Sequence, residues 1–214
     1  MLFWIDTLIV LVILTNLNLV SSSRLKVCIR VVAVQGMLLG LIPLLMGDMH
    51  VSLRIMLLSG LTMVIKGMVF PWLLSRALRS ANIHREMEPL VDYTTSMLIA
   101  VGLLAVVIWI GKQLPLPVAF QSPMIAPLSL FTIMIGLFMI VSRRKALSQV
   151  LGYLVMENGI YAFGLVFAQN EPLLVEIGTL LDVFMAVFIM GITIFHINRE
   201  FDHIDADRLS ALRD

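Results

Sequence analysis

The sequence has 214 residues, of which 60% are hydrophobic and 14% are charged. Because a soluble domain carries about 25% charged residues, this composition excludes an ordinary soluble domain and indicates that lipid surrounds most of the chain. The formal net charge of +1 hides an uneven distribution of basic residues. The single cysteine, Cys28, has no second cysteine for a disulfide or a CxxC site, so we expect no redox cofactor on this chain.

Apolar blocks, each about long enough to cross a bilayer core of roughly 30 Å, follow one another along the chain. They cover residues 2–20, 27–46, 52–75, 91–111, 123–141, 147–168 and 173–196. A strand interpretation fails because open sheet edges cannot be satisfied in hydrocarbon. The sequence therefore predicts an all-α polytopic membrane protein of about seven transmembrane helices. Since the first block lacks a basic flank and contains Asp6, we expect a retained helix and not a cleaved signal.

Most of the 15 Lys and Arg residues lie in alternate connections and in the C-terminal tail. They follow the first, third and fifth apolar blocks and the last one: Arg24, Lys26, Arg30, Arg76, Arg79, Arg85, Arg143, Arg144, Lys145, Arg199, Arg208 and Arg213. By the positive-inside rule, the N-terminus is predicted to lie outside and the C-terminus in the cytoplasm.

The connection over residues 112–127 contains four prolines and resembles a hinge between two bundles: Pro115, Pro117, Pro123 and Pro127. We therefore predict four parts along the chain. Residues 1–111 form an N-terminal four-helix membrane extension, and residues 112–127 a Pro-rich connection. Residues 128–198 form a three-helix membrane unit, and residues 199–214 a cytoplasmic tail. The first four helices are expected to act as scaffolding.

Three ionisable residues lie deep in apolar blocks, where one charge costs about 2.5–3.5 kcal/mol on insertion scales. Glu157 is about 15 Å below the cytoplasmic start of its helix, at a rise of roughly 1.5 Å per residue. Asp182 lies at a similar depth from the outer side, and Lys66 lies too deep in the third block to reach water easily. Each of these residues therefore requires a structural or functional explanation.

Polar residues form a stripe on each of the last two predicted helices. At i, i+4 spacing the sixth helix carries Gln149, Tyr153, Glu157 and Tyr161, and at i, i+3 spacing the seventh carries Glu176, Thr179 and Asp182. If these stripes face each other, the carboxylates can hold water and pass protons. The predicted proton path comprises Glu157, Asp182, Tyr153, Tyr161, Lys66 and Glu176.

Other interpretations of these residues remain open. Glu157 and Asp182 can instead join helices through hydrogen bonds, as polar side chains do in membranes. Glu176 lies near the outer surface, where a solvated interfacial position is an alternative, and Lys66 can form an ion pair with a helix or another subunit. Asp6, Asn16 and Asn18 are expected to be interfacial because they lie near helix ends. Small residues predict close helix packing at Gly136, Gly152, Gly159, Gly164 and Gly178.

Metal or nucleotide motifs such as HExxH and GxxxxGK[ST] do not occur in the sequence. The four histidines lack ligand spacing: His50, His84, His196 and His203. We expect no metal, no cofactor and no nucleic acid on this chain.

Two stretches carry a resemblance to a known family. Gly136-Leu-Phe-Met-Ile-Val-Ser-Arg-Arg-Lys, followed by Gly152-Tyr-Leu-Val-Met-Glu157-Asn158-Gly159, resembles chain K of bacterial NADH-quinone oxidoreductase (complex I) and the related C-type subunit of Mrp-type Na+/H+ antiporters. That similarity covers about residues 123–205. With the four preceding helices and the tail Ile194-Phe-His-Ile-Asn-Arg-Glu-Phe-Asp-His-Ile-Asp, nearly the full chain resembles the component E family of hydrogenase-4, of the formate hydrogenlyase type.

This resemblance implies roles for particular residues. Glu157 matches the second-helix Glu of the chain K family, which belongs to a buried hydrophilic axis of proton movement. The family's third-helix Glu does not carry over, because Phe184 stands at that position and Asp182 lies half a turn away. Asp182 is therefore a possible substitute.

The resemblance also implies a non-catalytic subunit that joins a proton-pumping membrane arm to a peripheral hydrogenase in the bacterial inner membrane. Its implied partners are antiporter-like and chain-H-like membrane subunits and peripheral hydrogenase subunits, which would carry the [NiFe] centre and iron-sulfur clusters. The alternatives are a cation/proton antiporter subunit or self-contained secondary transporter, and a purely structural assembly subunit.

Overall fold

A computed structural model describes residues 2–46, 53–80, 90–113 and 124–167, together with Phe184, Phe188 and Gly191. Within these residues the chain is helical and contains no strand, which confirms the predicted all-α class. The helices are α1 (Leu2–Ser21), α2 (Leu25–Met46), α3 (Leu53–Val64), the π-helical turn η1 (Ile65–Val69), α4 (Phe70–Ser80), α5 (Tyr93–Gly111), α6 (Ile125–Ser142) and α7 (Ala146–Phe167).

Five segments of the described residues are long and apolar enough to cross a membrane: Phe3–Ser21, Leu25–Leu45, Ser59–Arg79, Tyr93–Gly111 and Ile125–Ser142. The chain is thus a polytopic membrane protein. Helix α7 falls outside these five; its 22 residues include the polar Gln149, Glu157 and Asn158. The predicted last helix, residues 173–196, lies outside the described residues except for three helical positions, Phe184, Phe188 and Gly191. The count of seven and the orientation in the membrane stay predictions.

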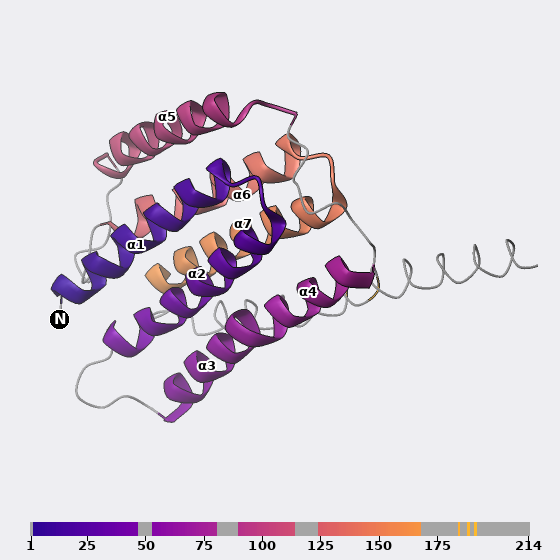
Figure 1. The fold of residues 1–214 in the computed structure, drawn as a ribbon. Coiled ribbons are helices and arrows are strands. Elements are labelled where there is room, and N and C mark those ends of the chain that lie inside the picture. Colours follow the sequence, from indigo (N-terminus) through magenta and orange to yellow (C-terminus); the bar gives the residue numbers. More distant parts are fainter. Residues whose placement is uncertain are drawn as a thin grey trace, which may run out of the picture.

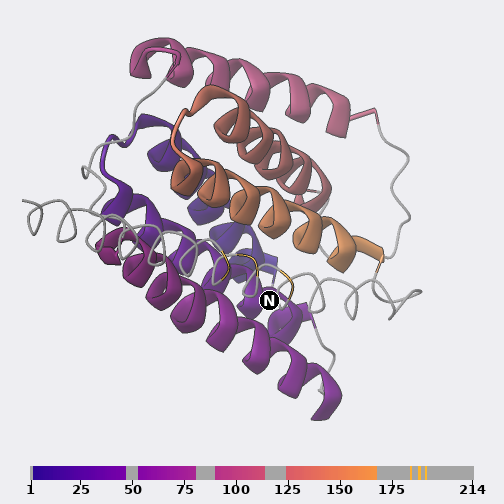
Figure 2. The ribbon, with the colours of Figure 1, turned by 90° about the vertical axis from the view of Figure 1, so that its right-hand side faces the viewer.

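Helices α3 and α4 run in the same direction as one rod, whereas the other consecutive helices run in opposite directions, as the colours along the chain show (Figure 1). The C-terminal ends of α1, α4 and α6 lie at the same end of the bundle as the N-terminal ends of α2, α5 and α7 (Figure 1). This is the end at which the predicted basic connections begin. The N-terminus of the chain lies at the opposite end. Helix α5 and the α3–α4 rod lie on opposite sides of the remaining helices (Figure 2).

The third predicted block forms one continuous helical rod, Leu53–Ser80, that widens at η1. At this turn the N–H of Phe70 donates to the carbonyl of Ile65, five residues earlier. Pro71 follows directly, and a proline within a helix has no N–H and crowds the carbonyl four residues before it. A wider turn relieves this crowding, and such π-helical turns are frequent at functional sites. Lys66 lies in this turn.

Helices α6 and α7 approach each other through glycine. A Cβ atom at Gly136 would lie 2.3 Å from the main-chain nitrogen of Met156, and one at Gly159 would lie 2.6 Å from that of Ile133. A Cβ at Gly152 would lie 2.9 Å from the nitrogen of Ile140. The close packing predicted at these three glycines is confirmed, whereas Gly178 lies outside the described residues.

One apolar core includes buried residues from α1, α2, α4, α5, α6 and α7. A second cluster contains buried residues from the N-terminal half of α1 and the C-terminal half of α2. These residues pack with the N-terminal end of α6 and the C-terminal end of α7. The helices on either side of the Pro-rich connection therefore share their core. The predicted division into four parts stays a prediction, and most of the connection lies outside the described residues.

Candidate functional site

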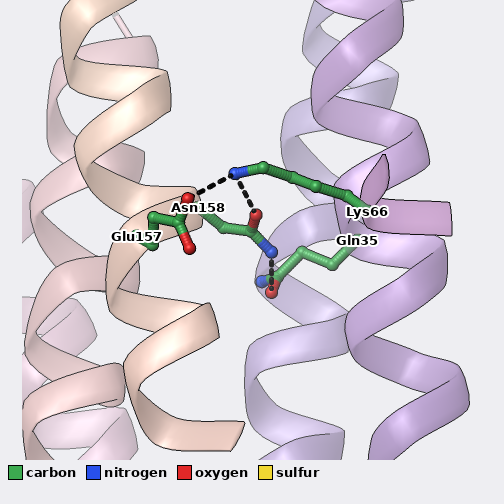
Figure 3. A network of polar contacts seen from close by, with 4 residues as sticks. All are labelled: Gln35, Lys66, Glu157 and Asn158. Atoms are coloured by element: carbon green, nitrogen blue, oxygen red, sulfur yellow. Dashed lines mark hydrogen bonds and ion pairs between the residues drawn. The ribbon is translucent and has the colours of Figure 1, made fainter. Parts of the chain in front are cut away.

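Two of the predicted ionisable residues meet in the interior of the bundle. Lys66 extends from η1 toward Glu157 on α7, and the Nζ atom of Lys66 lies 3.6 Å from Oε1 of Glu157 (Figure 3). The two side chains are only 4% and 2% exposed. Because an isolated charge at this depth is costly, the contact explains how each residue is tolerated in an apolar helix.

Lys66 also contacts two other side chains of α7. Its Nζ atom donates a hydrogen bond of 3.0 Å to Oδ1 of Asn158, across 92 positions of the sequence. The same ammonium group lies 5.2 Å from the centre of the Tyr161 ring, a distance at which a cation is attracted by the ring face. Lys66 is thus held by a carboxylate, an amide oxygen and an aromatic ring.

A chain of hydrogen bonds continues from Asn158 across the bundle. Nδ2 of Asn158 donates to Oε1 of Gln35 on α2 at 3.2 Å, as Figure 3 shows. Nε2 of Gln35 donates to Oδ1 of Asn16 on α1 at 2.7 Å. Nδ2 of Asn16 donates to Oγ1 of Thr132 on α6 at 2.9 Å, and that hydroxyl donates to the carbonyl of Leu128 at 2.9 Å. The polar chain therefore joins α1, α2, η1, α6 and α7.

The members of this chain are buried at 1% exposure or less: Asn16, Gln35, Thr132 and Asn158. A buried amide without hydrogen-bond partners would lower the stability of the fold, whereas a connected network of hydrogen bonds rigidifies its surroundings. Each amide here both donates and accepts. The network can therefore fix the relative positions of the helices and the place of the Lys66 ammonium.

Glycine permits Lys66 to enter this position. A Cβ atom at Gly36 of α2 would lie 2.6 Å from Cβ of Lys66. In the next residue of η1, a Cβ at Gly67 would lie 2.7 Å from Cγ of Met37. Any larger residue at position 36 would push the lysine stem away from α2 and therefore shift its ammonium relative to Glu157.

The structure brings together some, but not all, of the predicted site residues. Lys66, Glu157 and Tyr161 form one cluster, and Tyr153 lies half-buried one turn before Glu157 on α7. Gln149, at the start of the same stripe, is exposed and donates to the carbonyl of Arg143 at 3.2 Å. The predicted stripe of the last helix lies outside the described residues: Glu176, Thr179 and Asp182. Phe184 is described there and is exposed.

Asn16 corrects an expectation drawn from the sequence. We expected an interfacial position, but its side chain is fully buried and bonded to Gln35 and Thr132. Proximity to a helix end fixes depth along the helix only, whereas the side chain of Asn16 points inward. Asp6 and Asn18, on the same helix, are exposed.

Gln35, Asn158 and Thr132 were not predicted as site residues. Polar side chains in the middle of apolar blocks were the available signal for them.

At the end of the bundle where α6 joins α7, Arg143 is buried instead of solvated. Its Nη2 atom donates to the carbonyl of Val20 at 2.8 Å, and its guanidinium lies 5.1 Å from the centre of the Tyr93 ring. Burial lowers the pKa of the Arg143 guanidinium, and Tyr93 opposes that change. The N–H of Leu90 donates to the carbonyl of Ser142 at 2.8 Å. These contacts connect the C-terminal ends of α1 and α6 with the N-terminal end of α5.

In the part of the chain that the structure describes, no group of three or more His, Cys, Asp or Glu residues is arranged to hold a metal ion.

Comparisons with known proteins agree with the resemblance seen in the sequence. Residues 124–214 match the model of the family NADH-ubiquinone/plastoquinone oxidoreductase chain 4L. The chain is 33% identical over 207 residues to the uncharacterized protein Rv0085 of Mycobacterium tuberculosis, covering 94% of this chain and 92% of that protein. It is 25% identical over 209 residues to hydrogenase-4 component E of Escherichia coli K12 and of Shigella flexneri, covering 98% of this chain and 97% of those proteins. No solved structure matches the chain.

Similarity over nearly the full length, together with the chain 4L match in the C-terminal part, confirms the family. The chain belongs to the family that includes Rv0085 and hydrogenase-4 component E, and its C-terminal part matches the family of NADH-ubiquinone/plastoquinone oxidoreductase chain 4L.

Proposed function

We propose that the chain is a membrane-arm subunit of a multi-subunit hydrogenase, of the formate hydrogenlyase type, in a bacterial inner membrane. In this function Glu157 and Lys66 take part in proton movement coupled to electron transfer and hydrogen evolution. The buried pair, 3.6 Å apart, is the observation that carries the proposal, since paired ionisable groups inside a membrane commonly mark proton relays. The family relationship to hydrogenase-4 component E supports the choice of complex.

The pair can exchange a proton without a change in its total charge. An N–H bond of the Lys66 ammonium breaks, an O–H bond forms on Glu157, and a neutral amine and a carboxylic acid result. The reverse step restores the ion pair. Net transport needs a second group or a water molecule that receives the proton from the acid and another that returns one to the amine.

Groups on α7 and on the predicted last helix could extend this exchange into a path. Tyr153 and Tyr161 lie one turn on either side of Glu157 and supply hydroxyl groups. Asp182 is proposed as the next carboxylate, and Glu176 as the group closer to the outer surface. Electron transfer and hydrogen chemistry would take place on partner subunits that carry the [NiFe] centre and iron-sulfur clusters.

Purification from native membranes tests the assignment to a complex. We expect an affinity-tagged chain, extracted in a mild detergent, to co-purify with antiporter-like and chain-H-like membrane subunits and with peripheral hydrogenase subunits, identified by mass spectrometry. Recovery of the chain alone would favour a self-contained transporter. Recovery with cation/proton antiporter subunits and no hydrogenase subunits would favour the antiporter alternative.

The variant Glu157→Gln tests the proton role, with Asp92→Asn as its control because Asp92 is exposed at the start of α5. We expect Glu157→Gln to assemble normally but to lower proton uptake by inverted membrane vesicles during hydrogen evolution roughly tenfold or more, since a positioned proton-transfer group typically contributes at least that much. The control should retain full uptake. Normal coupled uptake in Glu157→Gln would exclude the proton role, and loss of assembly would favour a structural subunit.

A further inference from the structure

We infer that Asn158, Gln35 and Asn16 are positioning residues that hold Lys66 toward Glu157, and that the direction of their hydrogen bonds follows the charge of Lys66. This inference rests on the proposed proton exchange of the pair and adds the groups that control it. It also assigns a role at the site to the helices that precede the chain 4L match, since Lys66, Gln35 and Asn16 all lie before residue 124.

The direction of the hydrogen-bond chain follows from the chemistry of Lys66, its first donor. An ammonium group can only donate, so the atom of Asn158 that faces Lys66 must be Oδ1. Nδ2 of Asn158 must then point to Gln35, whose oxygen accepts and whose Nε2 is turned toward Asn16. The same requirement extends through Asn16 to the hydroxyl of Thr132. One charge therefore sets the orientation of three amides and one hydroxyl.

This orientation stabilises the ammonium. Along the chain the amide oxygens of Asn158, Gln35 and Asn16 lie on the side toward Lys66 and the amide nitrogens on the side away from it. Aligned hydrogen bonds polarise one another, and their effect is strong in a buried environment of low dielectric constant. The chain ends on the carbonyl of Leu128, so its last donor is satisfied by α6.

When Lys66 loses a proton, its Nζ atom no longer requires an acceptor from Asn158, so the hydrogen bonds are no longer held in this direction. When Lys66 transfers a proton to Glu157, its neutral Nζ gains a lone pair that can accept a hydrogen bond. Rotation of each amide then lets Asn158 donate to Lys66, Gln35 donate to Asn158, and Asn16 donate to Gln35. The hydroxyl of Thr132 donates to Asn16 in this state and leaves the carbonyl of Leu128. Every internal amide retains a donor and an acceptor in both directions.

Titratable groups near Lys66 come from α7: Glu157 and Tyr161 contact its ammonium group, and Tyr153 lies one turn before Glu157. Helices α1, α2 and α6 contribute two amides and a hydroxyl to the hydrogen-bond chain. A change in the direction of the amides should therefore follow the protonation of the Lys66–Glu157 pair.

Solid-state NMR of the full chain in lipid bilayers tests this inference. With 15N-labelled lysine and labelled asparagine and glutamine side chains, the Lys66 signal is assigned by its loss in Lys66→Arg. In the wild type we expect an ammonium signal for Lys66 with a through-space contact to the Asn158 side chain. As the pH rises, the side-chain amide shifts of Asn158 and Gln35 should change with the same midpoint as the Lys66 signal. Amide shifts that stay constant while Lys66 titrates would overturn the reversal of direction.

Gln35→Leu tests the positioning role, and Gln113→Leu is the matched control because Gln113 is exposed at the end of α5. We expect Gln35→Leu to lose most of the contact between Lys66 and Asn158, whereas the control keeps it. An unchanged contact in Gln35→Leu would overturn the positioning role. If this variant fails to fold, Gln35→Asn gives the same test. The exchange Gln35→Asn with Asn158→Gln, which preserves the combined side-chain length, should restore a contact between Lys66 and the amide at position 158; no restoration would contradict the inference.

These signals do not depend on hydrogen evolution. A negative NMR result would therefore contradict the role of the positioning residues, whereas the proposed function would still be decided by the Glu157→Gln experiment. Normal proton uptake in Glu157→Gln would contradict the proposed function but would not change the NMR result.

Discussion

The Nζ atom of Lys66 lies 3.6 Å from Oε1 of Glu157, and both side chains are almost completely buried. The two residues come from distant parts of the chain, one from the long helix with the π-helical turn and the other from α7. Because removal of either partner leaves a charge buried in apolar surroundings, neither residue is independent of the other. The helices before the chain 4L match therefore contribute Lys66 to the candidate site.

Lys66→Met should destabilise the bundle, because it leaves Glu157 buried without its lysine. Loss of one partner of a buried ion pair costs about 3–5 kcal/mol of unfolding free energy. Lys112→Met, at an exposed position after α5, should change this free energy by less than about 0.5 kcal/mol. Reversible unfolding in mixed detergent micelles measures both. Equal stability of the two variants would mean that Lys66 makes no essential contact.

Gly136→Ala should separate α6 from α7, because the added Cβ would lie 2.3 Å from a main-chain atom that cannot move aside easily. We expect a loss of about 1–3 kcal/mol in unfolding free energy, the usual cost of overpacking. Gly102→Ala is the matched control, since no atom lies within 4 Å of a Cβ at that position. The control should be neutral or stabilised by roughly 0.5–1 kcal/mol through helix propensity. A Gly136→Ala variant as stable as the control would exclude the close α6–α7 contact.

Arg143→Leu should loosen the end of the bundle at which α1 and α6 meet. The substitution removes the hydrogen bond to Val20 and the contact with the Tyr93 ring. A hydrogen bond to a charged group contributes about 1.5–3 kcal/mol, so we expect a loss of that size. Arg144→Leu changes the exposed neighbour and should have little effect. Comparable losses in the two variants would show that the burial of Arg143 is unimportant for stability.

The predicted orientation can be measured by cysteine labelling, since Cys28 is the only native cysteine. In a chain with Cys28→Ser, we expect Gln113→Cys to react with a membrane-impermeant maleimide in right-side-out membranes. Arg144→Cys, at the basic end, should react only after the membrane is opened. The reverse pattern would show that the basic connections lie outside and that the positive-inside prediction is wrong.

The positions of the described helices and the burial of Glu157 could be predicted from the sequence, because the apolar blocks and the place of Glu157 within its block can be read along the chain. Glu157 was predicted to be buried and is 2% exposed. The bounds of the first six predicted blocks differ from those of the described helices by a few residues, apart from the third block, whose helix extends to Ser80. Close helix packing at Gly136 could also be predicted, because glycine has no side chain to keep two helices apart.

What the sequence could not supply is which helices face one another. Membrane helices that are apolar all round give no amphipathic signal for the direction of a side chain. Asn16 illustrates this: its position near a helix end predicted an interface, but its direction places it in the interior. The partners of Lys66 depend likewise on how the long helix packs against α2 and α7, where glycine at position 36 admits the lysine stem.

The central claim, that Lys66 and Glu157 act together in proton transfer, is tested most directly by a double-mutant cycle. Proton uptake by inverted vesicles is measured per assembled complex for Lys66→Met, Glu157→Gln and the double variant. Because residues that act as a unit are strongly non-additive, the double variant should lose no more uptake than the more defective single variant. Two losses that multiply in the double variant would contradict the claim, since they would show that the two residues act independently.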